Sequence, residues 1–219
     1  MKPITKCAAV LLGAFAASGA NAAILTFDDA IAGETSYAFD GDGDGIDDVV
    51  FSTTDPSGFN TAGPGPNQSY ISEPGLEGTT ILAPDLRVDF LYGTAGSLRF
   101  GFAMSSLTGL VDGVEFSIYD TSDGLLASTN VLADFTLVDG VMESSFPEGL
   151  VDVSFAGVAS YALFDFSTND ATRYIIDNFE GTFGSSENVD NGVPVPAPLA
   201  LLGVGLVGLA TRKRRSAEH

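Results

Sequence analysis

The sequence predicts an all-β protein whose body is an antiparallel β-sandwich or a barrel. Apolar and polar residues alternate in many short runs; in residues 113–119, for example, Val114, Phe116 and Ile118 share one face. Gly, Pro, Asp and Ser separate these runs, at the spacing of about eight to twelve residues that is typical of sandwiches. Sixteen Phe supply large side chains for a core.

Eleven runs in the body have the strand pattern. They cover residues 23–27, 35–39, 48–53, 86–92, 97–104, 113–120, 125–132, 143–149, 151–157, 160–167 and 173–183. Residues 54–78 form a long loop rich in Gly and Pro between two of the runs. Long loops of this kind often carry a binding surface, so we expect this one to form a rim or a site.

The N-terminus has the three parts of a secretory signal peptide. Lys2 and Lys6 precede an apolar run, and Ala20 and Ala22 fit the small-residue rule for cleavage after Ala22. The run is too short to span a bilayer comfortably. We therefore predict a helical signal peptide over residues 1–22 and a β-sandwich domain over residues 23–184.

The C-terminus predicts a transmembrane helix. After a polar linker over residues 185–193, residues 193–211 carry no charge, and residues 199–210 are continuously apolar. A basic stop follows, made of Arg212, Lys213, Arg214 and Arg215. Basic residues beside a span hold that end in the cytoplasm, so the body is expected to lie on the exported side of the inner membrane.

This tail, residues 194–215, resembles the PEP-CTERM sorting signal of exported proteins in Gram-negative bacteria. Pro194, Val195 and Pro196 stand where the family has Pro-Glu-Pro, and the apolar helix and basic stop follow in the family's order. The resemblance implies recognition by an exosortase, which is a membrane-embedded cysteine protease, and removal or exchange of the tail. It also implies transient anchoring by the C-terminal helix, followed by release to the cell surface or the extracellular polysaccharide of a biofilm.

The body is also similar to the passenger domains of PEP-CTERM proteins. The segments "TFDD", "VEFSIYDTSDGLLAS" and "YIIDNFEGTF" occur in the passengers' order. By this resemblance the sandwich would be jelly-roll-like, with its first and last strands close together. The tail is also described as an ice-binding protein C-terminal type, but the body lacks the T-x-T arrays that an ice-binding face requires.

Charge and composition exclude several classes of function. Between residues 7 and 211 there are three arginines against 28 acidic residues, a net charge of −25. Such a surface repels phosphate backbones and attracts cations, so nucleic-acid binding is not expected. The only Cys and the only His are Cys7 and His219, both in the terminal segments. The body therefore has no disulfide, no Cys nucleophile and no His-based triad.

The strongest chemical motif is "DGDGDGIDD" in residues 40–48, which predicts a calcium site. Asp40, Asp42 and Asp44 occupy positions 1, 3 and 5 of a D-x-D-x-D-G loop, Ile46 would offer its carbonyl at position 7, and Asp48 follows at position 9. Without a cation these carboxylates would repel one another. The flanks are strand-like and no Glu stands at position 12, so the loop resembles the calcium loops of thrombospondin type 3 and integrin-type repeats.

A weaker constellation predicts a second calcium site. Asp28 and Asp29 follow the first predicted strand, while Asp177 and Asn178 lie in the last one. They would come together if these strands adjoin; otherwise they are surface carboxylates and an Asx-turn.

These observations favour an exported, surface-sorted, non-enzymatic protein with structural Ca²⁺. The alternative is a calcium-dependent carbohydrate-binding, lectin-like module, with an extracellular polysaccharide as partner. Six tyrosines are candidates for sugar stacking, although most are expected to be partly buried in the core: Tyr37, Tyr70, Tyr92, Tyr119, Tyr161 and Tyr174. A glycoside hydrolase is the weakest alternative, because 28 acidic residues supply carboxylate pairs without any specific motif.

Overall fold

The fold is known from a computed structural model. It describes residues 21–61, 63, 65, 67–72, 74–78, 86–106, 113–135, 137–138, 141–142, 146–166 and 171–184. Residues 1–20 of the predicted signal peptide, the predicted linker and the predicted sorting tail lie outside these ranges. Asn21 and Ala22, the last two residues of the predicted helical signal peptide, belong instead to the first strand, which pairs with the last one. The described body is all-β, as predicted, and within it no helix is both long and apolar enough to span a lipid bilayer.

The strands follow the chain in this order: β1 (Asn21–Leu25), β2 (Ser36–Phe39), β3 (Val49–Ser52), β4 (Leu76–Gly78), β5 (Leu86–Ser106), β6 (Gly113–Tyr119), β7 (Leu125–Leu132), β8 (Leu137–Val138), β9 (Val141–Met142), β10 (Glu148–Asp165) and β11 (Ala171–Phe183). Nine of them form one antiparallel sheet with the path β1-β11-β5-β10-β6-β7, to which β2, β3 and β4 add at the sides. β8 and β9 pair with each other.

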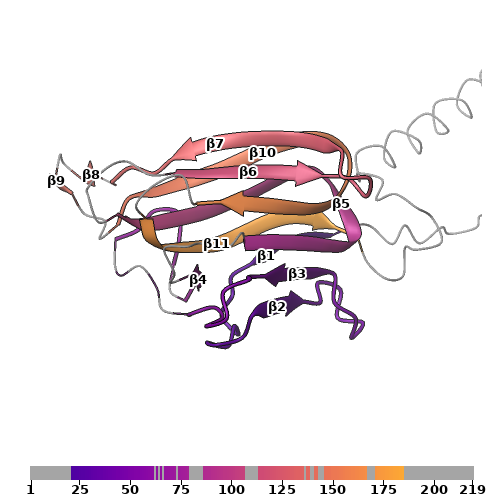
Figure 1. Cartoon of the computed structure of the whole chain (residues 1–219), viewed down its shortest axis with the longest axis horizontal. Helices are drawn as coiled ribbons and strands as arrows, with labels where there is room; N and C mark the ends of the chain where they lie inside the picture. Colours follow the sequence, from indigo (N-terminus) through magenta and orange to yellow (C-terminus); the bar gives the residue numbers. More distant parts are fainter. Residues whose placement is uncertain are drawn as a thin grey trace, which may run out of the picture.

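This single sheet is bent into two layers, and the long strands β5 and β10 each contribute one part to either layer (Figure 1). In the first layer, residues 86–90 of β5 lie between β3 and residues 161–164 of β10, and β6 and β7 continue the layer beyond β10. In the second layer, residues 94–103 of β5 lie between β11 and residues 148–159 of β10, and β1 and β4 pair with the far side of β11.

Glycines mark the points where the two long strands change layer. Gly93 and Gly96 of β5 have φ values of 79° and 92°, and Gly157 of β10 has a φ of 99°. The β5–β10 register shifts beside Gly157, between Phe155 and Ala159. Left-handed glycines and bulges of this kind let a strand bend sharply without a side-chain clash.

Phenylalanines fill the space between the layers. Phe51 of β3 meets Phe179 of β11 edge to face, with ring centroids 5.1 Å apart. Phe100 of β5 contacts Phe116 of β6 at 5.0 Å and Phe164 of β10 at 4.9 Å. All five rings are fully buried. The predicted sandwich is therefore confirmed, with aromatic contacts joining its two inner faces.

The expected and observed strands differ mainly at the bends. Residues 86–92 and 97–104 were expected as two strands but belong to the single strand β5, and residues 151–157 and 160–167 both fall largely within β10. Glycine is a strand breaker on average, yet here it bends a strand that continues to pair. The expected strand over residues 143–149 contributes Glu148 and Gly149 to β10, and the short strand β4 lies inside the expected loop.

Two buried carboxylates hold part of the long loop against the second layer. Glu148 is 3% exposed and accepts hydrogen bonds from the backbone N–H groups of Ser69 and Tyr70, both at 2.9 Å. Asp177 is fully buried, and its Oδ2 accepts from both the N–H and the hydroxyl of Ser72 at 2.7 Å. Residues 67–72 therefore lie close over the outer face of β5.

Gly101 of β5 makes this close approach possible. A Cβ atom at that position would lie 2.0 Å from the carbonyl oxygen of Tyr70. On the same outer face Ile71 packs against Ala103 and Ile175, which form a small apolar cluster with Phe146 beneath and beside the loop. The loop segment is thus fixed by both polar and apolar contacts.

Replacing Asp177 tests the loop attachment. Asp177→Ala removes the acceptor of two hydrogen bonds, and we expect it to lower the free energy of unfolding by about 2–3 kcal/mol. Asp177→Asn keeps an oxygen acceptor and should cost clearly less. Urea denaturation in EDTA at pH 7 measures both, and equal losses in the two variants would contradict this account.

The same pair of proteins tests the buried charge of Asp177. Burial raises the pKa of this carboxyl, and the charge of Asp28 acts in the same direction. The folded protein then binds the proton at a higher pH than the unfolded chain, so the wild type gains stability relative to Asp177→Asn as the pH falls from 7 toward about 4. A stability difference that does not change between pH 7 and about pH 4 would refute the raised pKa.

Candidate functional site

The predicted metal loop, residues 40–48, connects β2 to β3 in the first layer; we call it the aspartate loop. Asp40 organises it: its Oδ1 accepts the N–H of Gly43 at 2.7 Å and its Oδ2 accepts the N–H of Gly45 at 2.8 Å. Gly43 and Gly45 have φ values of 77° and 87°, a conformation that other residues rarely adopt. The alternating glycines therefore let the chain curl around Asp40.

Asp48 is the buried member of the loop, with 3% of its surface exposed. Its N–H donates to the carbonyl of Phe39 at 2.8 Å, and its carbonyl accepts the N–H of Leu91 in β5 at 2.9 Å. Its Oδ2 accepts the N–H of Gly41 at 2.9 Å. Its Oδ1 is buried and has no hydrogen-bond partner among the described residues. An unpartnered buried carboxylate oxygen is costly, so a bound cation would relieve it.

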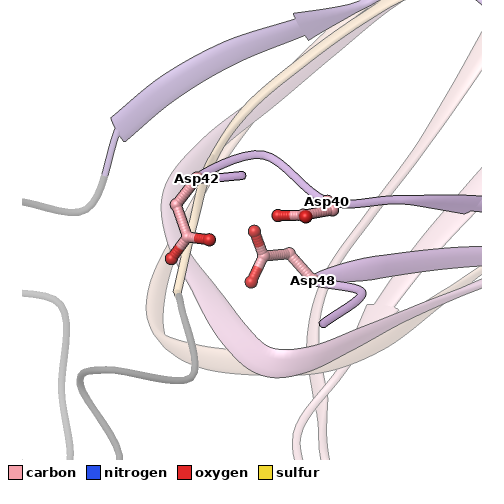
Figure 2. A group of neighbouring side chains, drawn as sticks. All are labelled: Asp40, Asp42 and Asp48. Atoms are coloured by element: carbon pink, nitrogen blue, oxygen red, sulfur yellow. The ribbon is translucent and has the colours of Figure 1, made fainter. Parts of the chain in front are cut away.

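The carboxylates of Asp40, Asp42 and Asp48 come together and could hold a metal ion. Each contributes an oxygen, and these oxygens lie within 4.8 Å of one another. Figure 2 shows the three side chains converging from the two ends of the loop. Such a cluster of carboxylate oxygens is the donor set of a hard cation.

The electrostatics of the cluster differ between its two ends. The N–H groups of Gly45 and Gly43 stabilise the charged form of Asp40 and lower its pKa. Burial raises the pKa of Asp48, and the negative charges of Asp42, Asp40 and Asp44 raise it further. The repulsion expected from the sequence is therefore concentrated on the buried carboxylate.

Asp44 and Ile46, the other two predicted ligands, belong to the same loop but not to the three-carboxylate group. Asp44 Oδ1 accepts the N–H of Ile46 at 2.7 Å. The side chain of Ile46 is 49% exposed. Their roles as metal ligands stay predictions.

The predicted second metal site has its strands in place but not its carboxylates. β1 and β11 adjoin, with Leu25 opposite Phe179. Among the described residues, however, no group of three carboxylates as tight as that in the aspartate loop includes Asp28, Asp29 or Asp177.

Each of the four residues instead makes a local contact. Asp28 accepts the Thr26 hydroxyl at 2.7 Å, and Asp29 accepts the Tyr37 hydroxyl at 2.8 Å. Asp177 binds Ser72 through Oδ2, as described above, while its buried Oδ1 has no partner among the described residues. Asn178 donates to the carbonyl of Tyr70 at 3.1 Å. The second site stays a prediction.

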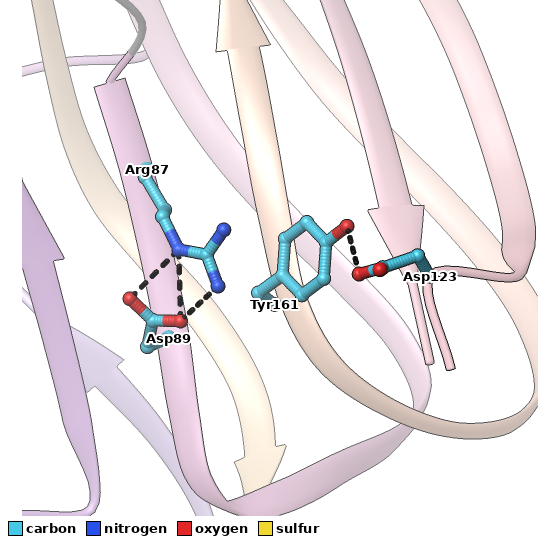
Figure 3. Close-up of polar contacts among 4 residues, drawn as sticks. All are labelled: Arg87, Asp89, Asp123 and Tyr161. Carbon is cyan, nitrogen blue, oxygen red and sulfur yellow. Dashed lines mark hydrogen bonds and ion pairs between the residues drawn. The ribbon is translucent and has the colours of Figure 1, made fainter. Parts of the chain in front are cut away.

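Most of the tyrosines proposed for sugar stacking have their rings engaged within the protein. The guanidinium of Arg87 lies 3.9 Å from the ring centre of Tyr161, and Tyr119 stacks on Tyr161 at 4.9 Å. The Tyr161 hydroxyl donates to Asp123 at 2.9 Å, and Arg87 pairs with Asp89 (Figure 3). Two neighbours therefore occupy the ring of Tyr161.

Three other tyrosines are buried or half-buried in the protein. Tyr174 is buried and stacks on Phe166 at 4.2 Å. Tyr37 is half-buried against Phe27, and Tyr92 is half-buried as well. Tyr70 differs from these because it is 41% exposed and lies in the loop segment over the second layer.

A groove on the outer face of the second layer was not expected from the sequence. It consists of two adjoining hollows of about 360 and 170 Å³, which share Arg99 and Glu180; we call it the outer groove. Its floor contains one row across four paired strands: Ile24 of β1 opposite Glu180 of β11, Glu180 opposite Arg99 of β5, and Arg99 opposite Asp152 of β10. Tyr70 lines the smaller hollow.

One residue in the sequence pointed to a polar site at this position. Arg99 is one of only three basic residues in the body, and it stands in an alternating strand whose other face is apolar. Which acidic residues flank it depends on strand register, and the register is not visible in one sequence.

Comparisons with known proteins identify no family. No protein-family model matches the chain, and no curated protein matches it significantly. Among solved structures, the K2 cleaved adhesin domain of Lys-gingipain has 18% identity and a TM-score of 0.42 over 76% of this chain and 100% of that domain. The mannan-recognising module TmCBM27 has 13% identity and a TM-score of 0.38, over 62% of this chain and 89% of that one.

A family 29 carbohydrate-binding module has 10% identity and a TM-score of 0.35, over 79% of this chain and 99% of that one. Likenesses at these TM-scores carry no argument about what this protein binds.

Proposed function

We propose that this protein is a non-enzymatic, calcium-stabilised β-sandwich that is exported, sorted to the cell surface, and works in the envelope or the extracellular polysaccharide matrix. The single observation that carries the calcium part is the carboxylate of Asp48. It is almost fully buried, it lies with Asp40 and Asp42, and its Oδ1 has no partner among the described residues.

The chemistry of the donors favours calcium over a transition metal. All three side-chain donors are carboxylates, and the described body contains neither His nor Cys. Calcium accepts six to eight oxygens at about 2.3–2.6 Å in flexible geometry. The predicted ligands Asp44 and Ile46 lie in the same loop and would raise the number of donor residues to five, and bidentate carboxylates or water would supply the remaining oxygens.

A structural role for the ion follows from where the loop is attached. Asp48 immediately precedes β3, and its carbonyl accepts the N–H of Leu91 in β5, the strand that runs through both layers. An ion at Asp48 would therefore stabilise the connection from β2 through β3 to β5. Nothing in this arrangement requires a reaction at the metal.

Carbohydrate binding is the second candidate function, and the outer groove favours it. The groove is formed by strands of the second layer, whereas the aspartate loop belongs to the first, and the two share no residue. An ion in the loop would not touch a ligand in the groove. Calcium would then support sugar binding only by stabilising the fold.

Sorting is supported by the sequence pattern of the two ends. The signal peptide, the Pro194-Val195-Pro196 motif, the apolar helix and the basic stop occur in the order that export followed by exosortase recognition requires. The proposed partner is therefore a membrane-embedded exosortase, met at the inner membrane before release.

Calcium should raise the melting temperature of the purified protein. At a calcium concentration 100 times the dissociation constant, the gain is about 2.7 kcal/mol, or roughly 5–10 °C for a chain of this size. Asp48→Asn should lose this gain, yet without calcium it should melt no lower than the wild type, because it removes an uncompensated buried charge.

Asp47→Asn is the matched control, because Asp47 is exposed and lies outside the three-carboxylate group. It should respond to calcium like the wild type. Calorimetric melting with EDTA and with added Ca²⁺ gives the comparison. A wild-type protein that does not respond to calcium would remove the basis of the proposal.

Tail processing should be visible in the mass of the exported protein. In a host with an exosortase, intact-mass analysis should find a chain without Arg212, Lys213, Arg214 and Arg215. Changing Pro194 and Pro196 to Ala should leave the full-length form in the membrane fraction, whereas Pro198→Ala, which lies outside the motif, should not. Retention of the four basic residues in the wild type would argue against sorting.

A further inference from the structure

The row Glu180–Arg99–Asp152 in the outer groove alternates hydrogen-bond acceptors with a donor. Arg99 lies between the two acidic residues, and its Nη1 is 3.7 Å from Glu180 Oε2, which is longer than a hydrogen bond. By contrast, Arg87 and Arg173 donate hydrogen bonds to Asp89 and Glu77. The guanidinium of Arg99 therefore retains planar donors that can serve a ligand.

The charges of the row indicate which ligand fits. A guanidinium with a carboxylate on each side presents donors and acceptors in alternation, which matches adjacent hydroxyl groups, since each hydroxyl both donates and accepts. The net charge of the row is negative, as is that of the whole body. An anionic ligand would be repelled by Glu180 and Asp152, so a neutral ligand is favoured.

The size and the rims of the groove suit a short carbohydrate chain. Four strands about 4.8 Å apart give the floor a width of roughly 14 Å, and the larger hollow of about 360 Å³ falls within the usual range for ligand sites of about 300–1,000 Å³. Ile24, 57% exposed, and Tyr70, 41% exposed, add apolar surface to the groove. Such surface can cover the C–H faces of sugar rings.

The wall of the groove is held in place before any ligand arrives. Tyr70 donates its N–H to Glu148 and accepts the side-chain N–H of Asn178, while Ser72 is bound to Asp177. A ligand would therefore not have to order this segment. Binding to a preordered segment is tighter because it loses less conformational entropy.

We propose that the outer groove binds a neutral glycan, with adjacent hydroxyls bridging Arg99 and the carboxylates of Glu180 and Asp152. This inference rests on the proposed carbohydrate-binding function and adds its site, its ligand class and its contact residues. Binding involves no bond cleavage.

The test uses the exported protein in calcium-containing buffer. Its probes are a panel of neutral polysaccharides (glucans, mannans, xylans and galactans) and of acidic ones (alginate and polygalacturonate), followed by calorimetry with the best binder. Arg99→Gln should weaken binding of the neutral polysaccharide at least about tenfold, which corresponds to about 1.4 kcal/mol. Glu180→Gln and Asp152→Asn should also weaken it. Glu115→Gln, an exposed change on β6 in the other layer, should leave it unchanged.

The outcomes separate the site from the function. Binding that is insensitive to Arg99→Gln overturns the site but leaves carbohydrate binding standing, whereas no binding to any polysaccharide overturns both. Acidic glycans that bind better, and bind more tightly after Glu180→Gln, would show that Arg99 holds an anion and would refute the neutral ligand. New reducing ends in the neutral polysaccharide, lost in Glu180→Gln, would reveal a hydrolase instead.

Discussion

The bent pairing of β5 with β10 is the constraint on which the rest of the structure depends. Each strand contributes one part to each layer, so the pair fixes both the distance between the layers and their relative order. The bends need left-handed glycines at Gly93, Gly96 and Gly157. Once the pair is bent, Phe100 and Phe164 face each other across the core. The outward residues of the same strands are then free to form surface sites.

Buried carboxylates are a second structural theme of this acidic chain. Asp48, Glu148 and Asp177 are each almost fully buried and each accepts backbone N–H groups from a loop. Hydrogen bonds to a charged acceptor are stronger than those to a neutral one, so a few carboxylates can fix loops that have no regular structure. At Glu148 and Asp177 the result is a rigid wall beside the outer groove. Asp48 and Asp177 each keep one buried oxygen without a partner among the described residues, but only beside Asp48 do two further carboxylates, those of Asp40 and Asp42, converge as a cation site requires.

The two candidate sites lie on different layers of the sandwich. The aspartate loop joins strands of the first layer and would bind an ion that supports the fold. The outer groove lies on the second layer and offers donors and acceptors to a ligand. Strand β5 belongs to both layers: its Leu91 donates a hydrogen bond to Asp48 of the aspartate loop, and its Arg99 lies in the floor of the outer groove. Weakening the aspartate loop would therefore destabilise β5, and with it the residues of the outer groove.

The sequence by itself determined the strand pattern, the Phe-rich core and the aspartate loop, because alternation and local spacing act over a few residues. It also indicated that residues 54–78 would form a rim. It did not reveal that glycines bend β5 and β10 instead of ending them, since a glycine's φ depends on the strands paired beside it. Tertiary structure alone decided that Asp48 would be buried with one free oxygen and that Ile24, Glu180, Arg99 and Asp152 would share a row. Those four residues come from strands far apart in the chain, and only strand register brings them together.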